Sequence, residues 1–169
     1  MTYFAAALTR VGEKWFADDV DIDECESLAD LGDLLRDMKG DVRLVVIEQD
    51  DEYAAIVRLD DDADDPRAFL SDGHAADAYP IAALIAEDLA EIGEDEQNDA
   101  AEEDGIFDSD TPRSHDSAPF GDADIVEDLG TSGAALMAMC AHPGTLPVDL
   151  LVALCEKAGC GAAFEELRG

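Results

Sequence analysis

The sequence has little positive charge and none of the common catalytic motifs. Lysine and arginine together number 10, against 43 aspartates and glutamates, and the formal net charge is −33. Nucleic-acid binding depends largely on lysine and arginine neutralising phosphates, so direct binding to DNA, RNA or an anionic membrane is disfavoured. The phosphate-binding G-x-G-x-x-G and G-x-x-x-x-G-K-[ST] motifs and the nucleophile motif G-x-S-x-G are absent. The charge favours a basic partner, and the alternative is a solvated acidic surface suited to high salt.

Long apolar runs and paired cysteines are also lacking. Nowhere do 18 apolar residues run together, and the start of the chain has no basic region of the kind that opens a signal peptide. We therefore expect a cytoplasmic protein. Four cysteines, at positions 25, 140, 155 and 160, do not form the framework of a disulfide-rich secreted domain. Reduced thiols are expected.

The charge divides the chain into three unequal blocks. Residues 1–84 hold 22 acids and 7 bases, residues 85–128 hold 17 and 1, and residues 129–169 hold 4 and 2, giving net charges of −15, −16 and −2. Together with the apolar pattern, this predicts an α+β domain over 1–92, an acidic disordered linker over 93–123 and a small helical segment over 124–169. The linker has too few large apolar groups to offset the entropy of ordering.

The pattern within residues 1–92 predicts a small antiparallel sheet with helices on one face. Connections between successive strands are tight, which favours antiparallel pairing. Ser27 can cap the first helix, and Gly40 is a suitable stop. Pro80 is expected to break or restart the second helix. The predicted elements are a hairpin of 2–9 and 14–20, a helix over 27–39, strands at 43–48, 53–59 and 66–70, and a helix from about 71 to 92.

The segment 124–169 is predicted to form short helices with a thin apolar core. Thr131 or Ser132 can cap the first, Pro147 lies near the start of the next, and Gly159 ends it. So small a core is expected to pack on the first domain, on a partner or on a second copy of the chain.

Cys140, His142, Cys155 and Cys160 are the best candidates for a metal site. Their residue types suit tetrahedral zinc, but zinc sites usually offer close pairs such as C-x-x-C, and the chain has none. Cys140 and Cys155 also fall on apolar helix faces, where free cysteine behaves as a small hydrophobe. We predict buried thiols, with no metal site and no cofactor.

Other candidate residues favour structural or solvated roles over chemistry. His74 and His115 have no matched partner, so neither is predicted to be catalytic. The acids at positions 60, 61, 62, 64 and 65 lack the glycine and distal glutamate of an EF-hand loop, and a solvated loop is preferred to a calcium site. Trp15, Phe16 and Tyr79 are possible contact points near loops, although Trp15 and Phe16 are expected to pack in the core.

Several segments together resemble a known family. They are the opening Tyr3-Phe4-Ala-Ala, the stretch Leu28-Ala-Asp-Leu-Gly-Asp-Leu-Leu-Arg36, the strand Leu44-Val-Val-Ile-Glu48, Pro66-Arg-Ala-Phe-Leu-Ser-Asp72, and the closing Ala163-Phe-Glu-Glu-Leu-Arg168. The pattern is similar to the tRNA adenosine deaminase-associated proteins of actinobacteria over most of the chain. That resemblance implies a role in tRNA modification and a possible partner, the enzyme that converts adenosine to inosine in tRNA. It implies no catalytic residues.

The chain itself lacks the signature of a zinc deaminase. Such enzymes need H-x-E and P-C-x-x-C, and none of the three histidines here is followed by that glutamate. The leading hypothesis is therefore a non-catalytic acidic accessory or regulatory protein, not an enzyme, that works by protein–protein interaction. One alternative is a self-associating module that uses the last helices or an open sheet edge, although the net charge opposes close approach of two copies. The other is a small enzyme of unrecognised type.

Overall fold

A six-stranded antiparallel sheet lies at the centre of the fold. The computed structural model describes residues 3–60, 66–97, 119–142 and 144–168. The sheet order is β2-β1-β3-β4-β5-β6, and each strand runs antiparallel to its neighbours. The strands are β1 (Tyr3–Val11), β2 (Lys14–Asp19), β3 (Val42–Gln49), β4 (Tyr53–Arg58), β5 (Arg67–Leu70) and β6 (Phe120–Gly121).

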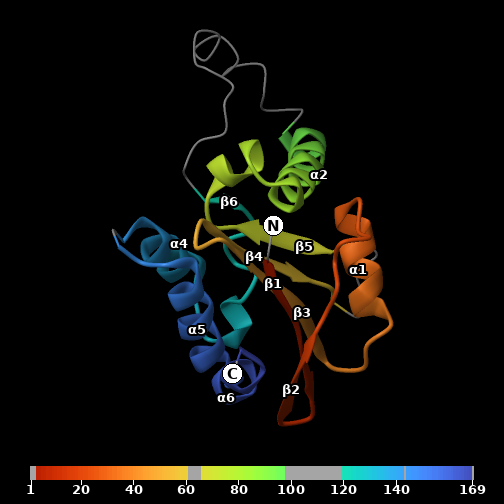
Figure 1. Ribbon diagram of the computed structural model, residues 1–169, viewed down its shortest axis with the longest axis vertical. Helices are drawn as coiled ribbons and strands as arrows, with labels where there is room; N and C mark the ends of the chain where they lie inside the picture. Colours follow the sequence, from red (N-terminus) through yellow and green to blue (C-terminus); the bar gives the residue numbers. More distant parts are fainter. Residues whose placement is uncertain (1–2, 61–65, 98–118, 143, 169) are drawn as a thin grey trace, which may run out of the picture.

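Helices cover both faces of this sheet (Figure 1). The first face carries α1 (Leu28–Arg36), the 3₁₀ turn η1 (Gly73–Asp77) and α2 (Pro80–Gln97). The second face carries the 3₁₀ turn η3 (Glu127–Leu129), α4 (Gly133–Ala141), α5 (Pro147–Ala158) and α6 (Gly161–Arg168). The α+β class is confirmed, and α1 and α2 cover one face as predicted.

Alternation along the strands supplies both cores. In β1, Ala5 and Ala7 enter the first core, while Ala6 and Leu8 enter the second. The central strand β3 divides in the same way and is buried on both sides, as its continuous apolar run predicts. The small alanines of β1 allow helices to approach the sheet from either face.

The caps predicted from sequence hold the helices in place. The Ser27 hydroxyl accepts a hydrogen bond from the Asp30 amide at 3.3 Å, and the Ser132 hydroxyl accepts one from Ala135 at 3.2 Å. Pro80 begins α2 and so restarts the helical chain after η1. Gly159 ends α5 with φ of 98°, a conformation that glycine adopts without strain.

Gly40 has a different role from the helix stop predicted for it. Helix α1 ends at Arg36, before Gly40. A Cβ at Gly40 would lie 2.9 Å from the Arg10 carbonyl oxygen, so the missing side chain instead permits a close approach to β1. The need for glycine at position 40 arises from its contact with β1, and the local sequence does not show that contact.

The segment 124–168 packs on the sheet of the first domain. This is one of the three packing arrangements expected for it, the others being a partner protein and a second copy of the chain. Leu136, Leu151 and Phe164 are buried in the second core. Phe164 also meets Phe4 of β1 edge to face, with ring centroids 5.6 Å apart.

The structure orders both ends of the predicted linker 93–123. Helix α2 runs past residue 93 to Gln97, and β6 pairs with β5 through Gly121 opposite Phe69. Gly121 has φ of 110°, and a Cβ there would lie 2.5 Å from the Ala68 carbonyl oxygen. Residues 98–118 of the predicted linker lie outside the described residues.

Candidate interaction surfaces

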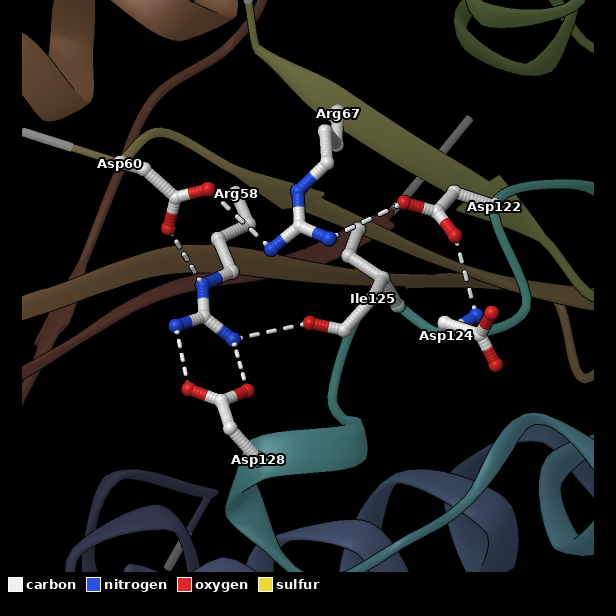
Figure 2. Close-up of polar contacts among 7 residues, drawn as sticks. All are labelled: Arg58, Asp60, Arg67, Asp122, Asp124, Ile125 and Asp128. Carbon is white, nitrogen blue, oxygen red and sulfur yellow. Dashed lines mark hydrogen bonds and ion pairs between the residues drawn. The ribbon is translucent and has the colours of Figure 1, made fainter. Parts of the chain in front are cut away.

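Arg58, at the end of β4, is the centre of a buried ion-pair network (Figure 2). Its side chain is only 6% exposed. The guanidinium donates two hydrogen bonds to the Asp128 carboxylate, at 2.6 and 2.8 Å, and one to Asp60 at 3.0 Å. It also donates to the Ile125 carbonyl at 2.9 Å. The paired geometry at Asp128 is that of a bidentate arginine–carboxylate contact, which is among the stronger polar contacts in proteins.

Arg67 of β5 continues this network towards β6. It lies 3.1 Å from Asp60 on one side and 3.1 Å from Asp122 on the other. Asp122 also accepts the amide of Asp124 at 3.0 Å and thereby fixes the turn that follows β6. We call Arg58, Asp60, Arg67, Asp122 and Asp128 the arginine clasp. It ties the chain that follows residue 118 to the sheet at two points.

Arg58 and Asp128 stabilise each other's charged states. The hydrogen bonds from Arg58 hold the pKa of the Asp128 carboxyl below its usual range, and the same bonds raise the pKa of Arg58. An ionised carboxylate bound in this way accepts hydrogen bonds and does not exchange protons near neutral pH. The clasp therefore suits a structural role. Its signal in the sequence was a lone arginine at the end of an otherwise apolar strand.

The candidate cysteines are buried in or against the second core. Cys155 and Cys160 are 3% and 1% exposed, and Cys140 packs against the same core. Burial raises the pKa of Cys140 to about 11, and a hydrogen bond with Cys160 together with burial raises the pKa of Cys155. The Cys140 and Cys155 thiols therefore stay protonated at neutral pH, whereas the same hydrogen bond lowers the pKa of Cys160. In the described part of the chain, no three His, Cys, Asp or Glu residues are grouped so as to hold a metal ion.

His74 and His142 lie on the surface. His74 lies 3.6 Å from the Asp77 carboxylate within η1. His142 caps the end of α4, and its Nδ1 lies 3.4 Å from the Thr145 hydroxyl. His115 and the acids at 61, 62, 64 and 65 are outside the described residues, whereas Asp60 belongs to the clasp.

A groove of about 590 Å³ follows the outer edge of the sheet at β2. Both faces of the edge contribute to it: Phe16 and Met38 lie on the side of α1, and Trp15 and Leu167 on the side of α6. Phe16, which lies opposite Thr9, is 50% exposed, and Val11, two residues beyond Thr9 on β1, is 49% exposed. Core packing was the expectation for both aromatics. Trp15 does pack against the second core, but Phe16 faces solvent because the first helical layer does not extend over it.

A smaller acidic hollow of about 150 Å³ lies between the β3–β4 turn and the start of α5. Asp51, Glu52 and Asp72 provide carboxylates, and Leu146, 46% exposed, provides an apolar contact. Asp50 and Asp51 both have positive φ, 55° and 59°. The backbone of this turn is therefore in the left-handed region, which most residues avoid, and it carries two carboxylate side chains. Tyr79, the third aromatic candidate, instead packs against Tyr53 with ring centroids 5.4 Å apart.

Several arginines are engaged within the fold. Arg36 pairs with Asp33, Arg43 donates to the carbonyls of Leu35 and Met38, and the clasp holds Arg58 and Arg67. Arg10 stacks over Trp15 at 5.8 Å from the ring centroid. None of the helices in the described ranges is both long enough and apolar enough to cross a membrane.

These features define an acidic α+β sandwich with an apolar groove at one sheet edge and an acidic hollow near α5. The family model described as Rv3753c-like tRNA adenosine deaminase-associated protein matches residues 3–161. The chain therefore belongs to this family, and the resemblance noted in its sequence is confirmed. No curated protein and no solved structure matches it.

Proposed function

We propose that this chain is a non-catalytic accessory protein that binds tRNA adenosine deaminase directly and regulates its access to tRNA. The name of the family associates its members with that enzyme. The observation that carries the finer proposal is the charge: a net −33, with several arginines already engaged inside the fold. Such a surface complements an enzyme that must present basic residues to tRNA phosphates.

The acidic hollow is the site that best fits such a partner. Lysine and arginine have apolar stems and charged ends, so they can contact an apolar residue and a carboxylate at the same time. Leu146 offers the apolar contact, and Asp51 and Glu52 offer the charges. Positions 85–128, with a net charge of −16 in the sequence, add long-range attraction towards the same basic surface.

Competition with tRNA follows from this arrangement. The chain and tRNA are both polyanions, and two polyanions that need one basic surface exclude each other. The chemistry of deamination stays with the enzyme, since this sequence lacks the H-x-E and C-x-x-C elements that a zinc deaminase requires. The accessory protein would therefore change the occupancy of the tRNA site and leave the chemical step as it is.

A tRNA-displacement assay with matched charge variants tests this proposal. We expect the wild-type chain to release labelled tRNA from the deaminase, less effectively as salt rises. The double variant Asp51→Asn, Glu52→Lys should lose most of this effect, while the control Glu165→Gln, Glu156→Lys changes the net charge equally on other elements and should retain it. A stable ternary complex of enzyme, chain and tRNA would refute the competition, and equal losses in both variants would refute the assignment to the hollow.

A further inference from the structure

Strand β2 is an open edge that the fold leaves available for pairing. Among the described residues it pairs with β1 alone, on one side, and it is six residues long with no proline. The opposite edge, β6, has only two residues. Native proteins usually protect long edge strands, because their unpaired backbone groups are ready to bind another strand.

The backbone of β2 shows which residues face outwards. The Val20 amide donates to the Ala5 carbonyl at 3.2 Å, so the backbone N–H of Val20 points towards β1. Amides two residues apart point to the same side of a strand, and therefore the backbone N–H groups of Phe16 and Asp18 also point towards β1. The N–H and C=O groups of Trp15 and Ala17 consequently point away from the sheet.

We propose that two copies of the chain pair through β2, antiparallel, with Phe16 opposite Phe16 of the second copy. The groove beside β2 gives room on both faces of the edge, and Phe16 is half exposed there. In this register Trp15 and Ala17 of one copy exchange backbone hydrogen bonds with Ala17 and Trp15 of the other. The two sheets then form one continuous sheet about a two-fold axis.

The alternation of inward- and outward-facing backbone groups, together with the charges, selects this register. Only residues whose backbone groups both face outwards can exchange hydrogen bonds, so a two-fold axis between Phe16 and Ala17 is excluded. Moving the axis to Trp15 would place Lys14 opposite Phe16, and moving it to Ala17 would place Phe16 opposite Asp18. With the axis at Phe16, Lys14 lies opposite Asp18 of the second copy, and both ends of the pairing gain an opposite-charge contact.

The net charge makes the dimer weak and dependent on ionic strength. At about 0.15 M salt the screening length is about 8 Å, so repulsion between the distant acidic surfaces is reduced while contacts at the paired strands remain. A single pair of strands is a small interface, and small interfaces are transient. We expect a monomer–dimer equilibrium that shifts with protein concentration.

Sedimentation equilibrium of charge-reversal variants tests the register. We expect the wild type to dimerise, and Lys14→Asp and Asp18→Lys each to remain monomeric because like charges then face each other. Mixing the two variants should restore a dimer, since both opposing pairs become attractive. Ala17→Pro removes an outward-facing N–H that has no partner in the described part of the chain, and it should abolish the dimer while leaving the thermal unfolding midpoint close to that of the wild type.

Two results would overturn the proposal. The first is a wild type that stays monomeric at about 1 mM, which would place any Kd for dimerisation above the millimolar range. The second is a wild-type dimer that survives Ala17→Pro, which would place the interface elsewhere. Oxidation with diamide gives an independent check: Phe16→Cys should form an intermolecular disulfide at that position, because opposed strand residues lie within disulfide range. The equally exposed Val11→Cys should not.

Discussion

Replacing Arg58 with methionine should destabilise the protein by removing the centre of the arginine clasp. Methionine keeps much of the length of the arginine stem but removes the charge and all donors. The substitution therefore deletes the bonds to Asp60, Ile125 and Asp128 with little change in packing volume. It leaves the second core without its polar attachment to β4.

The expected loss follows from the exposure of each partner. Breaking a fully buried pair costs about 3–5 kcal/mol because the remaining charge is stranded. Here the Asp128 side chain is 57% exposed and Asp60 is 39% exposed, so both carboxylates regain water when Arg58 is removed. What remains is the loss of charged hydrogen bonds and of the donor to the buried Ile125 carbonyl. We therefore expect about 2–3 kcal/mol.

Urea unfolding followed by circular dichroism measures this loss, with Arg36→Met as the control. Arg36 also pairs with an aspartate, Asp33, but their side chains are 52% and 64% exposed. Exposed pairs contribute about 0–1 kcal/mol, so the control should change the free energy of unfolding little. Equal effects of the two substitutions would show that burial does not set the strength of the clasp, and the reasoning would fail.

Further predictions concern pH, packing, backbone space and thiol reactivity. Because the pKa of Asp128 is lowered in the fold, this carboxylate contributes to the free energy of unfolding above its unfolded pKa of about 4, and that contribution is lost as pH falls through the folded pKa. Asp128→Asn should therefore make the free energy of unfolding fall less steeply at acid pH, and an unchanged slope would contradict this. Phe164→Ala should destabilise by about 3–5 kcal/mol in urea, given a fully buried ring against Phe4, and a loss under about 1 kcal/mol would contradict its place in the core. Gly121→Ala should cost about 2 kcal/mol or more, since a Cβ there meets a backbone carbonyl at positive φ; hydrogen exchange in β5 should then rise, and a variant as stable as the wild type would refute the close contact. Alkylation of Cys140, followed by peptide mass spectrometry, should keep accelerating with pH towards about 11, whereas an early plateau near pH 9 would contradict its burial.

The sequence predicts most of the local structure because local signals specify it. Gly12, with φ of 65°, is in the first of the two turn positions between β1 and β2, where a two-residue hairpin favours glycine. Ser27 and Ser132 are both found as caps, and Pro80 and Pro147 are both found at helix starts. Each of these features depends on a few neighbouring residues, so reading along the chain finds them.

Long-range features were not predicted, for a physical reason. Strand β6 has two residues and no apolar period, so no local pattern distinguishes it from the acidic sequence before it. Its position depends on Gly121 against Ala68 and on Asp122 against Arg67, contacts that join residues more than 50 positions apart. The coverage of the second face likewise depends on where the apolar sides of α4 to α6 pack. The sequence allowed packing on the first domain, on a partner or on a second copy, and in the structure these helices pack on the sheet.

The most direct test of the account is calorimetric titration of the purified chain into the tRNA adenosine deaminase of the same organism, at low and at high salt. We expect saturable binding that weakens as salt rises, because an acidic surface meets a basic one. Absence of heat at both salt concentrations, with the two proteins eluting separately from a sizing column, would contradict a direct physical partnership.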